Sequence, residues 1–358
     1  MEPGILPNWN TERRLRLESR WRALDAHGGS WAGWSKLVCS NKDHRGVHHQ
    51  LPHETACNGA RDLVYMEDPG THRATLWRYC ASCNSLHNAD FSSEIEALLG
   101  EDVDREQVEQ MWLDASRTPR ATAEQQAVLV RILRVHCARQ RRHGADARGS
   151  QYVQGMHMLA SCPLWAGLNE VEALQVFEFV LSQVCTDYYT DPDFAAFSRD
   201  AYVVETLVSE RLPLLSKLMH TAGLPVQVLT FDPLLCLFTH NTPQSTALRF
   251  WDVILIEGDC AAVIALFLSL LEHALPEAVL EAMTEQELLL SNLNKRFSAL
   301  AAADIEEVVR TARDLLDGTG PIDIRQRVKE LRIQAASANA DTSWWDVDVL
   351  SQFRSWWS

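Results

Sequence analysis

The sequence predicts an all-α protein, and three observations carry this prediction. From about residue 70 onward, amphipathic stretches of 12 to 20 residues alternate with short clusters rich in Gly, Pro, Asn and Asp. Period-two alternation with β-branched residues, the pattern of a half-buried strand, is nearly absent. Several stretches begin with Thr or Asn followed three residues later by Glu or Gln, which is the signature of a helix capping box.

The composition is that of a globular chain. The 358 residues are 46% hydrophobic and 23% charged, which excludes wholesale disorder and fibrous architectures. A formal net charge of −15 argues against a nucleic-acid partner, because binding the phosphate backbone needs a basic face. The longest apolar run, residues 261–271, is about half of the ~20 residues that a membrane-spanning helix requires. The N-terminus has neither the basic start nor the apolar block of a secretory signal, so we expect a cytoplasmic protein.

The elements follow in order along the chain. Residues 1–68 are polar, with a His-rich piece and no clear period. Capping boxes at Thr122/Gln125 and Asn169/Glu172 predict helices to about residues 142 and 185, and Thr284/Glu287 predicts a third. The remaining expected helices span 200–221, 244–257, 259–275, 302–316 and 322–338. A Trp-rich tail follows, which we expect to cover an apolar patch, and the nine irregularly spaced cysteines are expected to be reduced and mostly buried.

The first polar element between helices runs from Met111 to Pro119. Asp114 and Arg117 are three residues apart, a spacing that places a carboxylate beside a guanidinium on one helical turn. Pro119 ends the helix just afterwards, so Arg117 is expected at the end of an element, oriented by Asp114. The alternative is an ordinary surface ion pair worth about 0 to 1 kcal/mol.

The second element is residues 151–156, after a basic, Gly-rich loop. Gly155 permits close approach of a backbone or a ligand. The Gln154 carboxamide can orient a water molecule, because it both accepts and donates hydrogen bonds. The alternative is a glutamine at a helix start that bonds nearby backbone.

The third element comprises residues 231–238 and 248–253. Arg249 and Asp252 repeat the spacing of Asp114 and Arg117, but they lie among aromatic residues, which favours a structural role. The chain has no G-x-x-x-x-G-K, H-E-x-x-H or G-x-S-x-G motif, so a self-contained NTPase or hydrolase is not expected.

Together these elements resemble the TBC domain of Rab GTPase-activating proteins. Residues 111–117 are similar to its I-x-x-D-x-x-R motif, 152–154 match its Y-x-Q motif, and 248–258 are similar to its R-x-W-D block. Residues 70–77 look like the opening R-x-x-x-W segment, so the resemblance covers roughly residues 70–318. It implies a two-lobed helical TBC domain over 69–320, with a divergent extension over 1–68 and a C-terminal helix and tail over 321–358.

The resemblance also implies a function. The domain would accelerate GTP hydrolysis by a GTP-bound Rab in trans, with Arg117 as arginine finger and Gln154 orienting the attacking water. Asp114, Tyr152 and Gly155 would support these fingers. The residues implied as structural braces are Arg73, Trp77, Arg249, Trp251 and Asp252. No metal or cofactor of its own is expected, because GTP and Mg²⁺ arrive with the partner, and a lipidated GTPase suffices to recruit the domain to membranes.

Two alternatives remain open at this stage. One is a catalytically silent TBC domain that acts as a Rab-binding scaffold. The other is an interaction module stabilised by zinc, since His and Cys side chains cluster near the N-terminus. Its candidate ligands are Cys39, His44, His48, His49, His53, Cys57, Cys80, Cys83 and His87. One departure from the family pattern is His157, which stands where the family usually has Asn.

Overall fold

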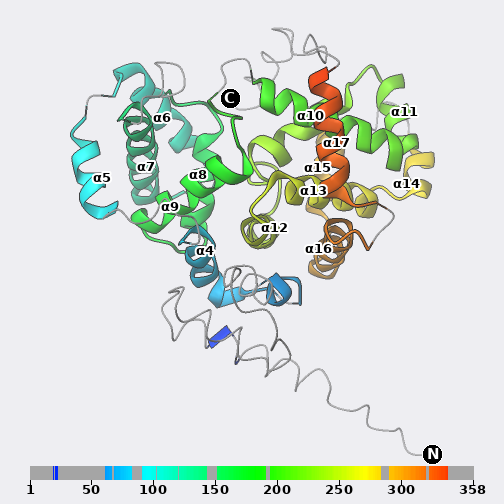
Figure 1. Ribbon diagram of the computed structural model, residues 1–358, viewed down its shortest axis with the longest axis horizontal. Coiled ribbons are helices and arrows are strands. Elements are labelled where there is room, and N and C mark those ends of the chain that lie inside the picture. Colours follow the sequence, from blue (N-terminus) through cyan, green and yellow to red (C-terminus); the bar gives the residue numbers. More distant parts are fainter. Residues whose placement is uncertain are drawn as a thin grey trace, which may run out of the picture.

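The computed structural model describes residues 19, 21–22, 61–66, 68–82, 91–101, 103–119, 121–142, 151–190, 194–283, 290–319 and 322–337. Every regular element within these ranges is a helix, which confirms the all-α prediction. The helices form two groups that lie side by side (Figure 1). We call them the N-terminal lobe, α4 to α9, and the C-terminal lobe, α10 to α17.

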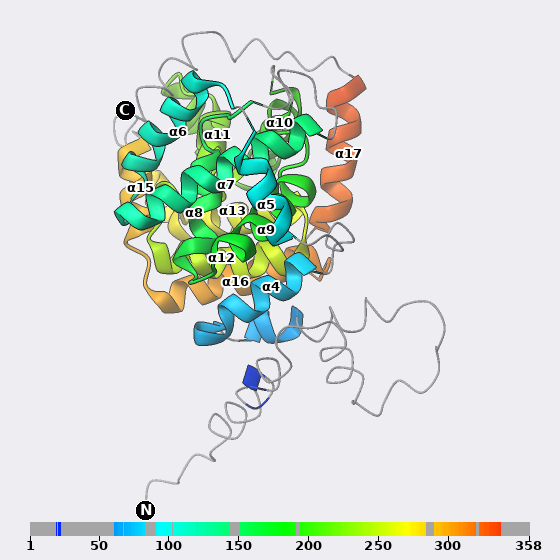
Figure 2. The ribbon, with the colours of Figure 1, turned by 90° about the vertical axis from the view of Figure 1, so that its left-hand side faces the viewer.

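Figure 2 shows the N-terminal lobe facing the viewer, and its helix α8 is buried from Met156 to Pro163. A 3₁₀ turn, η1, precedes it, and a π-helical turn, η3, extends its last helix. Its elements are η1 (Gly70–His72), α4 (Arg73–Ser82), α5 (Phe91–Leu99), α6 (Arg105–Arg117), α7 (Ala123–Arg142), α8 (Met156–Trp165), α9 (Glu170–Phe179) and η3 (Val180–Val184).

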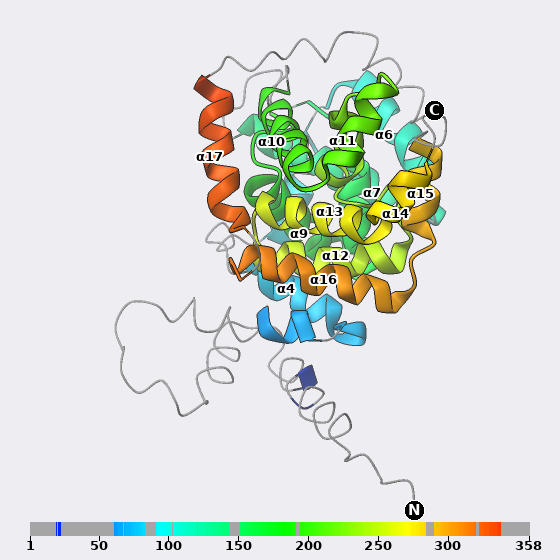
Figure 3. The same ribbon diagram turned by 90° about the vertical axis from the view of Figure 1, so that its right-hand side faces the viewer.

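The C-terminal lobe surrounds α13, whose sequence is apolar on all sides and which is buried over almost its whole length. Figure 3 shows α10 and α11 on one side of α13 and α16 on the other. The elements are α10 (Ala195–Arg211), α11 (Pro213–Thr221), η4 (Val226–Thr230), η5 (Phe231–Leu235), α12 (Gln244–Glu257), α13 (Cys260–Ala274), α14 (Glu277–Ala282), α15 (Leu290–Ser298), α16 (Ala302–Leu316) and α17 (Ile324–Ser337).

Two of the three predicted capping boxes are confirmed. The Thr122 and Gln125 backbone N–H groups each donate to the other residue's side chain, at 3.0 and 3.2 Å. Asn169 and Glu172 make the same reciprocal pair at 3.0 Å in both directions. The third box, Thr284/Glu287, lies outside the described residues, as does the Trp-rich tail.

The single helix predicted over 200–221 is wrong. The structure has two helices, α10 and α11, separated at Leu212. Pro213 is the cause, because proline disfavours helical dihedrals in the preceding residue and is itself suited to the first position of a new helix.

Residues 61–66, which the sequence places in the N-terminal extension, are helical and contribute to the core. Leu63, Val64 and Tyr65 are buried. The six described cysteines are free thiols and buried, as expected: Cys80, Cys137, Cys162, Cys185, Cys236 and Cys260.

Candidate functional site

Arg117 is the last residue of α6, and its side chain is exposed. The helix stops at Thr118, whose backbone N–H donates to the Ala115 carbonyl at 3.2 Å and whose hydroxyl donates to the Asp114 carbonyl at 3.0 Å. Among the described residues, the Arg117 guanidinium has neither an ion pair nor a hydrogen bond. No described residue therefore occupies the Arg117 guanidinium.

The predicted ion pair between Asp114 and Arg117 is not formed. Asp114 is buried and accepts from the Tyr152 hydroxyl at 2.8 Å and from the Gln110 amide at 3.0 Å. The physical reason is the direction of the two side chains, since Asp114 faces the core while Arg117 faces solvent at the helix end. Asp114 is therefore bonded to Tyr152 and Gln110 and not to the arginine.

Tyr152 joins the loop before α8 to α6 at two points. Its hydroxyl bonds Asp114, and its backbone N–H donates to the Gln107 carboxamide at 3.1 Å. The segment that carries Gln154 is thus fixed to the same helix that ends in Arg117. Gln154 itself is half-buried, and its carboxamide has no hydrogen bond among the described residues.

Gly155 makes the turn between Gln154 and α8. Its φ of 108° is a conformation that L side chains rarely adopt. A Cβ at this position would meet the Tyr189 hydroxyl at 3.5 Å, an ordinary contact, so the backbone angle and not crowding selects glycine here. The Tyr189 hydroxyl in turn bonds the Leu235 carbonyl of the C-terminal lobe.

His157 completes the buried group beneath the loop. Its Nδ1 lies 3.0 Å from the Tyr152 oxygen. Because the phenol hydrogen is directed to Asp114, the hydrogen of this second bond must come from His157 Nδ1. Burial lowers the pKa of His157 to about 4, with the Asp114 carboxylate opposing this shift and His240 adding to it. Burial and the same carboxylate raise the pKa of Tyr152 well above its usual value, so the phenol stays protonated.

The predicted braces Arg73, Trp77 and Asp252 form one buried cluster between the lobes. The Arg73 Nε donates to Asp252 at 2.9 Å, and the Trp77 indole N–H donates to the same carboxylate at 2.8 Å. Trp77 also stacks on Trp251 with ring centroids 5.5 Å apart, which joins α4 to α12. Burial raises the pKa of Asp252, while Arg73 lowers it.

Arg249 is almost completely buried. Although it lies three residues before Asp252, the two side chains form neither an ion pair nor a hydrogen bond with each other. It donates to Glu306 of α16 at 2.7 Å and to the Val64 carbonyl at 2.8 Å. The two residues therefore have different partners: Arg249 bonds Glu306 of α16, and Asp252 bonds Arg73 of α4. Trp251 donates its indole N–H to the Leu237 carbonyl at 2.8 Å.

The Rab-GTPase-TBC domain family profile matches residues 70–278, more than half of the chain. The chain belongs to this family.

Curated relatives carry the same TBC domain. Growth hormone-regulated TBC protein 1-A of Danio rerio is 25% identical over 201 residues, 53% of this chain and 53% of that protein. Growth hormone-regulated TBC protein 1 of Xenopus laevis is 30% identical over 107 residues, 30% of this chain and 31% of that protein. The chain therefore spans about half or less of the length of these relatives.

Two solved structures share the TBC fold. The Chlamydomonas flagellar RabGAP TBC domain superposes with a TM-score of 0.57 at 18% identity, covering 83% of this chain and 96% of that one. The Ypt/Rab-GAP domain of Gyp1p superposes with a TM-score of 0.59 at 17% identity, covering 74% and 94%. At these identities the similarity establishes the fold.

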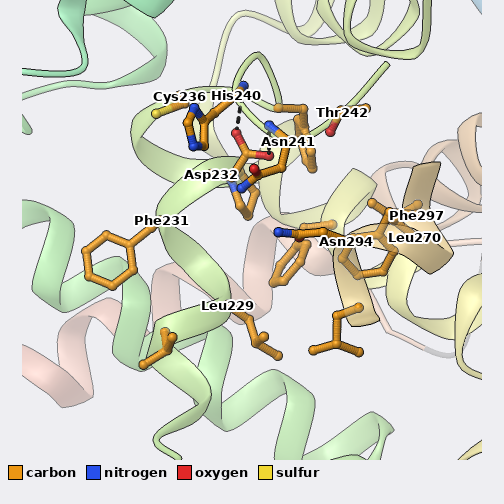
Figure 4. A pocket seen from close by; sticks show the side chains of 15 residues that line it. Leu229, Phe231, Asp232, Cys236, His240, Asn241, Thr242, Leu270, Asn294 and Phe297 are labelled. Carbon is orange, nitrogen blue, oxygen red and sulfur yellow. Dashed lines mark hydrogen bonds between the residues drawn. The ribbon is translucent and has the colours of Figure 1, made fainter. Parts of the chain in front are cut away.

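A small cavity of about 50 Å³ lies between η5, α13 and α15 (Figure 4). Sequence reasoning did not find it, because its walls come from segments far apart in the chain. Its half-buried carboxylate, Asp232, already accepts from the backbone N–H groups of His240 and Asn241, at 3.1 and 3.3 Å. Burial raises the pKa of Asp232. The cavity has room for a few water molecules.

The zinc prediction lies mostly outside the described residues. Of its nine candidate ligands only Cys80 is described, and it is a buried free thiol in α4. The described ranges contain no group of His, Cys, Asp or Glu side chains that could hold a metal ion. Within the same ranges, no helix is both long and apolar enough to cross a membrane.

Proposed function

We propose that this TBC domain is a GTPase-activating protein for a Rab-type small GTPase, and that it supplies Arg117 and Gln154 to the active site of the partner. One observation carries the proposal. Both side chains lack hydrogen-bond partners among the described residues, while the segments that bear them are held together through Tyr152. This combination of free functional groups on a fixed support suits a site that is completed by another protein.

Each side chain has a defined chemical task. The guanidinium of Arg117 is planar and permanently charged, so it can stabilise the negative charge that develops on the phosphate oxygens during phosphoryl transfer. The Gln154 carboxamide accepts one hydrogen bond and donates another, which lets it orient the attacking water. GTP and Mg²⁺ belong to the GTP-bound partner, so the domain needs no cofactor of its own.

The charge of the chain does not oppose this role. The formal net charge is −15, but the phosphate and its metal ion arrive already bound to the partner. Only a local positive group is needed, and Arg117 provides it. Since a lipidated GTPase would bring the domain to its membrane, we expect a cytoplasmic protein that is partly peripheral to endomembranes.

The test is GTP hydrolysis by a panel of GTP-loaded Rabs. Wild-type chain is compared with Arg117→Ala and Gln154→Ala, and Arg105→Ala at the other, exposed end of α6 is the matched control. An arginine finger contributes about 10³ to 10⁵ in rate, so Arg117→Ala should abolish most of the acceleration. Acceleration that is equal in wild type and both finger variants would contradict the mechanism. Binding of a Rab without any acceleration would favour the scaffold alternative.

A further inference from the structure

The outer face of the last two turns of α6 carries an apolar patch beside Arg117. We define this patch as Trp112 and Leu113, which are 46% and 44% exposed. The opposite face of the same turns is buried, through Met111, Asp114 and Ala115. Only two other large apolar side chains in the described ranges are exposed, Met66 and Ile333.

The position of the patch relative to Arg117 is fixed by the helix. Leu113 and Arg117 are four residues apart, so they are neighbours on one face with about 5–6 Å between their Cβ atoms. Trp112 precedes Leu113 in α6 and lies four residues before Ser116, which is also exposed. A protein surface that reaches Arg117 along this face of α6 therefore also meets Leu113, with Trp112 next to it.

We infer that Trp112 and Leu113 form an apolar docking contact for the GTPase itself, and that this contact determines which GTPases the domain binds. The inference rests on the proposed function, because it is the nucleotide of the partner that brings the partner's surface to Arg117. The fitting partner presents apolar side chains next to its nucleotide. Tryptophan is the residue type that most often anchors protein interfaces, since it buries a large area with little loss of conformational freedom.

The extent of the patch is limited, which makes the contact selective. Toward the start of α6 the exposed residues are charged, with Glu109 paired to Arg105 at 2.9 Å and Glu106 exposed. At the other end Arg117 begins the phosphate-binding region. A partner that places a charged or polar side chain opposite Trp112 would leave that group without hydrogen bonds and would be rejected.

The experiment uses the full chain and the Rab that it stimulates most. Trp112→Gln, Leu113→Gln and the double variant keep a good helix former on α6 while removing the apolar surface. Met66→Gln is the matched control, because Met66 is exposed to the same 46% as Trp112. We expect KM of the double variant for the GTP-loaded Rab to rise at least about tenfold with kcat little changed, since a docking contact exists before and during the reaction. Arg117→Ala should instead lower kcat.

Several outcomes separate this inference from the proposed function. If no Rab is stimulated by wild type, the proposed function fails and the inference fails with it. If wild type stimulates a Rab and the double variant has an unchanged KM, only the docking contact is overturned. It is equally overturned if KM decreases, which would mean that the chain covers its own patch, or if light scattering shows a wild-type dimer that the double variant loses. Unfolding curves of wild type and variants should coincide.

Discussion

The Tyr152 hydroxyl donates to the buried Asp114 carboxylate across 2.8 Å, and this bond joins the helix that ends in Arg117 to the loop that carries Gln154. Neither Tyr152 nor Asp114 is exposed. Together with the bond from the Tyr152 backbone N–H to Gln107, this bond ties the segment that carries Gln154 to the helix that ends in Arg117.

Tyr152→Phe should destabilise the chain and weaken GTPase activation together. It removes the hydroxyl that Asp114 and His157 share, which leaves two buried polar groups incompletely bonded. The expected loss in the free energy of unfolding is about 1–3 kcal/mol, measured by urea denaturation. Tyr202→Phe is the control, because Tyr202 is a half-buried residue of α10. It should change neither the free energy of unfolding nor GTPase activation. Full stability in Tyr152→Phe would show that the bond is not formed in solution.

Acid should destabilise the chain through His157. Its pKa is about 4 in the folded protein and about 6.5 when unfolded, so the unfolded state binds more protons between these values. The free energy of unfolding contributed by this group is therefore complete above pH 6.5 and decreases by about 3 kcal/mol as the pH falls to 4. His157→Asn, which has no titrating group, should lose correspondingly less stability over that interval. Parallel pH profiles for the two proteins would refute the assignment.

Gly155→Ala should cost at least about 1 kcal/mol of stability, because an alanine is strained at a φ of 108°. It should also reduce activation, since relief of the strain would move Gln154. Gly100→Ala is the control, as its added Cβ would meet only the Ala97 carbonyl oxygen at 3.6 Å. Urea denaturation of both variants measures the difference. An equal effect of the two substitutions would argue against a special backbone role of Gly155.

Arg73→Ala should be the most damaging of these changes. It leaves the Asp252 carboxylate, which is fully buried, without its charged partner, and removing one member of such a pair costs about 3–5 kcal/mol. Arg105→Ala breaks the ion pair with Glu109, whose two side chains are 91% and 65% exposed. The loss in the free energy of unfolding should therefore be about 0.5 kcal/mol or less. Thermal or urea unfolding distinguishes the two. Similar losses would mean that the buried pair contributes no more than a surface one.

Helix positions were predictable where local rules decide them. The capping boxes at Thr122 and Asn169 mark the starts of α7 and α9, and the predicted span 244–257 coincides with α12. Pro213 predicts the break between α10 and α11, which the hydrophobic periodicity alone does not indicate. The motifs that resemble a TBC domain were recognisable because their residue types and order lie in the chain itself.

The partners of charged side chains were not predictable. A three-residue spacing suggested Asp114 with Arg117 and Arg249 with Asp252, and in both cases the structure chose other partners. Asp114 bonds Tyr152, which is 38 residues away, Arg249 bonds Glu306 at a separation of 57, and Asp252 bonds Arg73 at a separation of 179. A buried charged side chain bonds a hydrogen-bonding or oppositely charged group that the packed core brings within reach, and sequence spacing has little influence on which group that is.

The sequence alone thus determined that the chain is helical, that its helices begin and end near their capping and proline signals, and that Arg117 and Gln154 are the side chains to test. These properties depend on interactions within a few residues. Only the tertiary structure decided that Tyr152 fixes the two segments together, that His157 is held neutral, and that Trp112 and Leu113 lie uncovered beside Arg117. Those properties depend on burial, which arises only when distant helices pack.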